Sequence, residues 1–197
     1  MTVETTPLTK EEMQLLNDQI APLLRTIMPE AFVPRAFAAI QSAIEQSKKR
    51  HGMAFGGMLP NSGQLGIQPL SAREFDLATT WTFRTNWSST TWQTLISGST
   101  PLSRYTHVVV LGYEDLENVP RSRAIKETVG GVEHPIIDLQ ELRRSDKQFE
   151  AIEPYIAGPV SPFKLEVYVE TTGYDDTHPW GFVVAPYTYL VSKTFQA

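Results

Sequence analysis

The first 50 residues show a hydrophobic pattern with the period of an α-helix. Thr9 to Glu12 read T-K-E-E, the pattern of a capping box at a helix N-terminus. Apolar residues then recur at steps of three and four and form one stripe: Met13, Leu16, Ile20, Leu23, Leu24 and Ile27. Pro22 should kink or split this helix, and Pro29 should end it.

A second helix should start near Pro34, with Phe37, Ile40 and Ile44 on one face. It ends in SKKRHG, where Gly52 is suited to terminate a helix in a left-handed conformation. The basic cluster before Gly52 complements the helix dipole, and it is too short to indicate a nucleic-acid-binding surface. We therefore expect residues 1–52 to form a helical arm.

Residues 53–70 are expected to form a Gly/Pro-rich loop, because residues 52–70 hold five glycines and two prolines. The apolar residues of this segment would be costly to leave in water, so they should pack on the body or on a partner. They are Met53, Phe55, Met58, Leu59, Leu65 and Ile67.

After Ser71 the hydrophobic period changes to two, which is typical of β-strands. Segments of strand character, separated by turn signals, are expected at 77–87, 90–96, 105–111, 124–129, 132–139, 149–156, 163–170 and 181–191. Gly130-Gly131 indicates a hairpin, and Pro186 indicates a bulge or a sheet edge. These strands, without helices long enough for parallel crossovers, predict a mainly β fold over 71–197. The expected fold is an antiparallel β-sandwich, jelly-roll-like, with two N-terminal α-helices.

The segment 77–87 places Trp81, Phe83 and Trp87 on one face of a strand. Three interpretations are open: a wall of the core, which we favour, a sugar-binding platform, or an assembly interface. The 19 residues between Arg84 and Arg104 carry no charge. An uncharged, Thr-rich surface suits an interface between copies of one subunit. The expected interface residues are Met53, Phe55, Met58, Leu59 and Trp92.

Composition removes several classes of function. The net charge of the 197 residues is −5, which argues against direct nucleic-acid binding. The absence of cysteine excludes disulfides and Cys-ligated metals. The N-terminal sequence lacks the features of a signal peptide, and no apolar run approaches the ~20 residues of a membrane span. We expect synthesis in the cytoplasm of some cell.

Metal binding has one local candidate, formed by Asp175, Asp176 and His178. The same residues suit an ordinary turn before Pro179, which is the favoured interpretation. His134 and Asp138 would stand about 13 Å apart on a strand, too far apart to share an ion. His107 is expected to be a core or interface residue. Without a nucleophile elbow or a phosphate-binding loop, we expect a non-enzymatic protein with no cofactor and no essential metal.

The stretch 105–191 resembles β-rich structural proteins of bacterial and archaeal virus particles. The resemblance is carried by the hairpin AIKETVGGVEHPIIDL, the strand PFKLEVYVETTG and the closing HPWGFVVAPYTYLV. It implies a capsid, decoration or tail-associated role in a virion and carries no catalytic residues. The expected partners are copies of this chain and other virion proteins. Two alternatives stay open: a carbohydrate- or ligand-binding β-sandwich module, and a metal-dependent jelly-roll enzyme.

Overall fold

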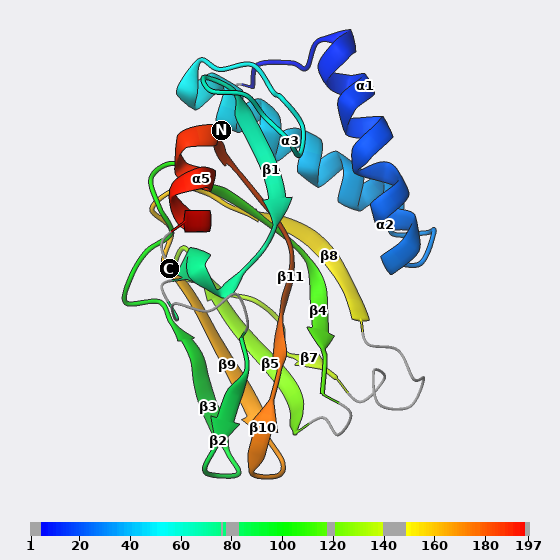
Figure 1. Ribbon diagram of the computed structural model, residues 1–197. Helices are drawn as coiled ribbons and strands as arrows, with labels where there is room; N and C mark the ends of the chain where they lie inside the picture. The colour runs from blue at the N-terminus through cyan, green and yellow to red at the C-terminus, as the bar shows by residue number, and fades with distance from the viewer. Residues whose placement is uncertain (1–4, 76, 78–82, 118–120, 140–148, 196–197) are drawn as a thin grey trace.

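A computed structural model describes residues 5–75, 77, 83–117, 121–139 and 149–195 (Figure 1). The N-terminal helices are α1 (Lys10–Gln19), α2 (Ala21–Ile27) and α3 (Val33–His51). The expected capping box is confirmed, because Thr9 N donates to the Glu12 carboxylate at 2.8 Å and Glu12 N donates to the Thr9 hydroxyl at 3.2 Å. Pro22, in the first turn of α2, marks the expected split. None of the described helices has the length and apolar character that crossing a membrane requires.

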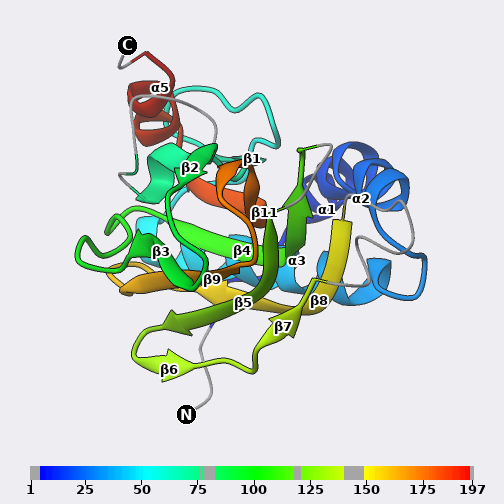
Figure 2. The same cartoon turned by 90° about the horizontal axis from the view of Figure 1, so that it is seen from below.

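The described strands form two antiparallel sheets and a short ribbon (Figures 1 and 2). The helix-side sheet contains, in spatial order, β1 (Leu65–Pro69), β11 (Thr177–Pro186), β4 (His107–Asp115) and β8 (Phe149–Ala157). The outer sheet contains β3 (Trp92–Ser97), β9 (Phe163–Val169), β5 (Ser122–Val129) and β6 (Val132–Glu133), with β7 (Ile137–Asp138) also on β5. The ribbon pairs β2 (Thr85–Trp87) with β10 (Gly173–Asp175).

The strand pairs are nested along the chain. The first strand pairs with the last, β1 with β11, and the series continues inward with β2 and β10, β3 and β9, and β4 and β8. At the centre β5 pairs with β6 and β7 around Gly130 and Gly131, whose φ angles of 59° and 84° suit the expected two-residue turn. Two further pairs, β11 with β4 and β9 with β5, complete the sheets.

Two hydrophobic cores lie on the two faces of the helix-side sheet. Val108 and Val110 of β4 belong to the core that also contains Leu165 of β9 in the outer sheet. Val109, between them, belongs to the second core with Ile40 of α3. The strand β4 is therefore buried on both faces, in agreement with its continuous apolar run. The protein is a mainly β fold with helices packed against one sheet.

The N-terminal 70 residues pack as part of this fold. Leu16 of α1, Phe55 and Leu65 of β1 are buried in the same core as Val109 and Phe182 of the helix-side sheet. Residues of the expected arm, loop and sandwich domain thus meet in the helix-side core. The interval 53–70, expected to be a loop, contains β1, which is paired with β11 over its whole length.

One strand expectation needs correction at its end, and another falls partly outside the described residues. The closing strand was expected to reach Val191, but β11 ends at Pro186 and the helix α5 (Tyr187–Phe195) follows. Proline offers no N–H to continue a ladder, and Tyr187 N donates instead to Gln64 O at 2.9 Å. Of the expected strand 77–87, the structure describes β2, while Trp81 lies outside the described residues. Burial of Phe83 and Trp87 confirms the core interpretation for these two side chains.

Candidate functional site

The three residues proposed as a metal cluster lie at the junction of β10 and β11. Asp175 ends β10, and Asp176 separates it from Thr177, the first residue of β11. The favoured turn interpretation is therefore wrong, because pairing with β2 and β4 holds both flanks of Asp176 in extended conformation. Side chains alternate along extended chain, so Asp175 and His178 have different surroundings.

Asp175 is the acceptor of a buried hydrogen-bond network. Its side chain is 1% exposed and accepts from Trp87 Nε1 at 3.2 Å, Thr177 Oγ1 at 3.1 Å and the Ser122 hydroxyl. The backbone N–H of Arg121 donates to its other oxygen at 2.9 Å. With both oxygens occupied by protein donors, this carboxylate ties the β2–β10 ribbon to β5 and β11.

His178 lies between two carboxylates. Its Nε2 is 2.8 Å from Glu114 Oε1, and its Nδ1 is 2.8 Å from the Asp176 carbonyl and 3.1 Å from Asp176 Oδ1. The ring stacks on Phe83 with centroids 4.8 Å apart and planes 9° apart. Burial acts to lower the pKa of His178, but the bonds with Asp176 and Glu114 outweigh it and raise the pKa to about 9.

This arrangement makes His178 a cation and a donor at neutral pH. A metal ion would have to displace the proton of this imidazole before the ring could bind it. Within the described part of the chain, no group of three or more His, Asp or Glu side chains is placed to hold a metal. The chemistry of the Asp176, His178 and Glu114 group is therefore that of an ion-pair cluster.

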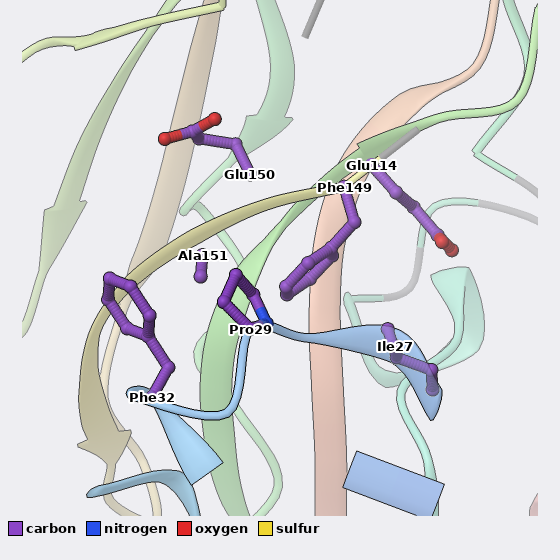
Figure 3. Close-up of a pocket in the computed structure, with 7 residues that line it drawn as sticks. All are labelled: Ile27, Pro29, Phe32, Glu114, Phe149, Glu150 and Ala151. Atoms are coloured by element: carbon purple, nitrogen blue, oxygen red, sulfur yellow. The ribbon is translucent and has the colours of Figure 1, made fainter. Parts of the chain in front are cut away.

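Glu114 connects this cluster to a pocket of about 610 Å³ at the end of the helix-side sheet (Figure 3). Its walls come from the α2–α3 connection, the end of β4 and the start of β8: Ile27, Pro29, Phe32, Glu114, Phe149, Glu150 and Ala151. Figure 3 shows the Phe149 ring beside Pro29, with Glu150 pointing away from that ring. The volume lies within the range of small-molecule sites. The pocket offers an apolar floor and two carboxylates, one of which is bonded to His178.

A second pocket, of about 330 Å³, lies where α3, β11 and α5 meet. It is lined by His51, Met53, Tyr105, Pro186, Thr188, Tyr189 and Ser192. His107 lies nearby in β4 and is buried, as expected. Burial, followed by the charges of His51 and Arg50, lowers the pKa of His107 to about 4. His107 is thus neutral at physiological pH.

A buried acid between the two sheets has no obvious signal in the sequence. Glu127 of β5 is 1% exposed and accepts hydrogen bonds from Tyr113 and, at 2.6 Å, from Tyr155, which belong to the helix-side sheet. His134 Nδ1 lies 3.3 Å from Glu127 Oε1. The alternation of β5 and β8 gives no reason to pair these residues, since the acid and its donors come from different sheets.

The expected interface residues occupy three different environments. Phe55 is buried in the helix-side core, and Met53 and Met58 pack against that core. Leu59 is 89% exposed. Trp92 is on the outer sheet, 37% exposed, with its ring edge-on to Tyr168 at 5.5 Å between centroids. The structure therefore offers Leu59 and Trp92 to a partner at separate places.

Comparison with known proteins adds one solved structure. No protein-family model matches the sequence, and no curated protein matches it. The chain has some similarity to a mutant VP2 protein of infectious bursal disease virus in derived T=1 particles, with a TM-score of 0.27 and 11% identity. The alignment covers 65% of this chain and 33% of that chain.

Proposed function

We propose that this chain is a non-enzymatic structural subunit that assembles with copies of itself in a virus particle. The observation that carries the proposal is the nested strand pairing, from β1 with β11 to β5 with β6 and β7. A long antiparallel hairpin that wraps into two facing sheets produces this pairing. It is the arrangement expected of a jelly roll, which is used by viral capsid domains, lectins and cupins.

The interior of the sandwich favours the structural role over a cupin-type enzyme. Cupin-type chemistry places its ligands on side chains that face the space between the sheets. Here that space receives apolar side chains from both sheets, including Val108, Val183, Leu165 and Val167. The acid that faces it, Glu127, accepts bonds from two tyrosines and serves to join the sheets.

The position of the aromatic residues favours assembly over a sugar-binding platform on β2. A platform needs exposed rings, but Phe83 and Trp87 are 4% and 6% exposed. Phe83 is covered by Phe75 and by His178, and the Trp87 indole donates to Asp175. These rings hold the fold together.

Electron microscopy of the purified chain at increasing concentration tests the proposal. We expect uniform closed rings or shells, because contacts at two different places on one subunit, here near Leu59 and near Trp92, can close into such assemblies. A chain that stays dispersed at all concentrations, and that binds glycans or turns over a substrate, would replace the structural proposal with one of the alternatives.

A further inference from the structure

In the described part of the chain, four strand edges border the two sheets, and three of them have features that hinder pairing with another chain. The free edge of β1 is covered by residues 54–57. Gly56 N donates to Leu65 O at 2.8 Å, and Leu65 N donates to Ala54 O at 2.8 Å. Ile67 N adds a bond to Gly57 O at 3.1 Å. The backbone of β1 therefore has partners on both sides.

The edges at β8 and at β6 and β7 are protected by composition and length. Pro154 lies within β8 and lacks the N–H that an added strand would use. Glu150 and Glu153 add negative charge to β8, and Glu153 is bound by Arg35 at 2.8 Å. The strands β6 and β7 have two residues each and carry Glu133 and Asp138. Charges, proline and short length are the usual protections of sheet edges.

The edge strand β3 lacks these three protections and has a bulge instead. Its sequence, WQTLIS, contains neither charge nor proline, and in the described part of the chain it pairs with β9 alone. A bulge between Thr94 and Ile96 interrupts its register. On either side of the bulge, Trp92, Thr94 and Ser97 are aligned with Tyr168, Glu166 and Lys164 of β9. The bulge therefore keeps these three β3 residues on the outward face, where all three are exposed.

We propose that the β3 edge pairs antiparallel with β3 of a second copy of this chain, which extends the outer sheet across a twofold axis. This inference rests on the proposed function and names one of its contacts. In an isologous antiparallel strand pair, residues near the twofold axis lie beside their own copies, so a charge there would face a like charge. The absence of charge over 85–103 removes that repulsion.

The exposed indole gives the pair a defined register. In an antiparallel pair of this strand with itself, Trp92 of one copy lies beside Ser97 of the other. Ser97 is followed by Gly98, whose φ of 71° turns the chain away, and these small residues leave room for the ring. Burial of the exposed part of Trp92 would make it the apolar anchor of the contact.

The test compares two variants that add the same charge to different edges. Thr94→Lys places a lysine beside Glu166 in the free subunit, which favours folding, but brings two lysines together in the β3 pair. Val132→Lys is the matched control, since Val132 is 64% exposed on β6. We expect Thr94→Lys to weaken the β3-dependent association about tenfold or more in sedimentation equilibrium, and Val132→Lys to leave it unchanged.

The outcomes separate this inference from the proposed function. If the wild-type chain assembles and both variants associate as strongly as the wild type, the β3 contact is refuted and self-assembly is retained. If the wild-type chain stays monomeric, both the proposed self-assembly and the β3 contact are refuted. If Thr94→Lys does not fold, hydrogen exchange of the unmodified chain decides. Slower exchange of the β3 amides on assembly supports the contact, and unchanged exchange refutes it. The β3 contact is also refuted if the chain shows no association through β3 but binds a glycan, and if Trp92→Ala abolishes that binding.

Discussion

His178→Gln should remove a pH-dependent part of the stability. The pKa of His178 is raised from 6.5 to about 9, against the effect of burial, by hydrogen bonds with Asp176 and Glu114. The side chain is 10% exposed, so solvent screens these bonds little. At about 1.4 kcal/mol for each pKa unit, the difference between 6.5 and about 9 corresponds to about 3 kcal/mol.

The direction of the effect follows from proton binding. A folded-state pKa above the unfolded-state pKa means that the folded protein binds the proton more tightly. The stabilisation is therefore complete below pH 6.5 and is lost as the pH rises through about 9. Wild type should lose about 3 kcal/mol from this group between pH 6 and pH 9.5, while His178→Gln should lack this component.

Urea unfolding followed by tryptophan fluorescence, at a series of pH values, gives the required free energies. Groups that titrate in both proteins cancel in the difference between wild type and His178→Gln. Glu114→Gln is a second control, because it removes one of the two carboxylates and should reduce the pH-dependent difference without abolishing it. Parallel pH profiles for wild type and His178→Gln would refute the assignment of His178 as a buried cation.

Three further substitutions test the packing of the fold. Trp87→Ala should cost about 3–5 kcal/mol in urea unfolding, because it empties a buried site and removes a donor to Asp175; a cost below 1 kcal/mol would contradict the core assignment. Glu12→Ala should lower the free energy of unfolding by about 3–5 kcal/mol, because the buried Lys48 loses its carboxylate partner and, within the described residues, keeps only the bond to the Pro7 carbonyl; an unchanged melting temperature would contradict this. Gly181→Ala should cost about 1–3 kcal/mol or more, because its Cβ would meet the β4 backbone at the bulge; wild-type thermal stability would contradict that close approach.

Local signals in the sequence predicted the elements whose geometry is decided locally. The capping box at Thr9, the end of α3 at Gly52 and the Gly130-Gly131 hairpin each depend on a few consecutive residues. The alternation along β9 likewise reports directly which side chains face the core. These features required no knowledge of the distant chain.

Elements that depend on distant partners were not predicted. Residues 65–69 form β1 because β11, more than 100 residues later, supplies the hydrogen bonds, although glycine and proline make the segment resemble a loop. The nested order of the strands is likewise a sum of long-range pairs, and the expectation of an antiparallel sandwich did not specify which strands pair. The end of β11 was misplaced because the segment after Pro186 retains an apolar character that suits α5 as well as a strand.

The candidate site was predicted in composition but not in geometry. The sequence drew attention to Asp176 and His178, yet His178 is completed by Glu114, 64 residues earlier. Asp175, two residues before Thr177, belongs to a different network. The pocket beside Glu114 combines residues from α2, β4 and β8, so no local sequence pattern could predict it.

The solution mass of the full chain tests self-assembly most directly. Deletion of residues 1–70 cannot serve this purpose, because Leu16, Phe55 and Leu65 belong to the core of the helix-side sheet and the truncated chain would lose that core. Light scattering of the intact chain over a range of concentrations avoids the problem. Self-assembly predicts a defined multiple of 22.1 kDa that increases in population with concentration. A single species of 22.1 kDa at every concentration up to the solubility limit would contradict it.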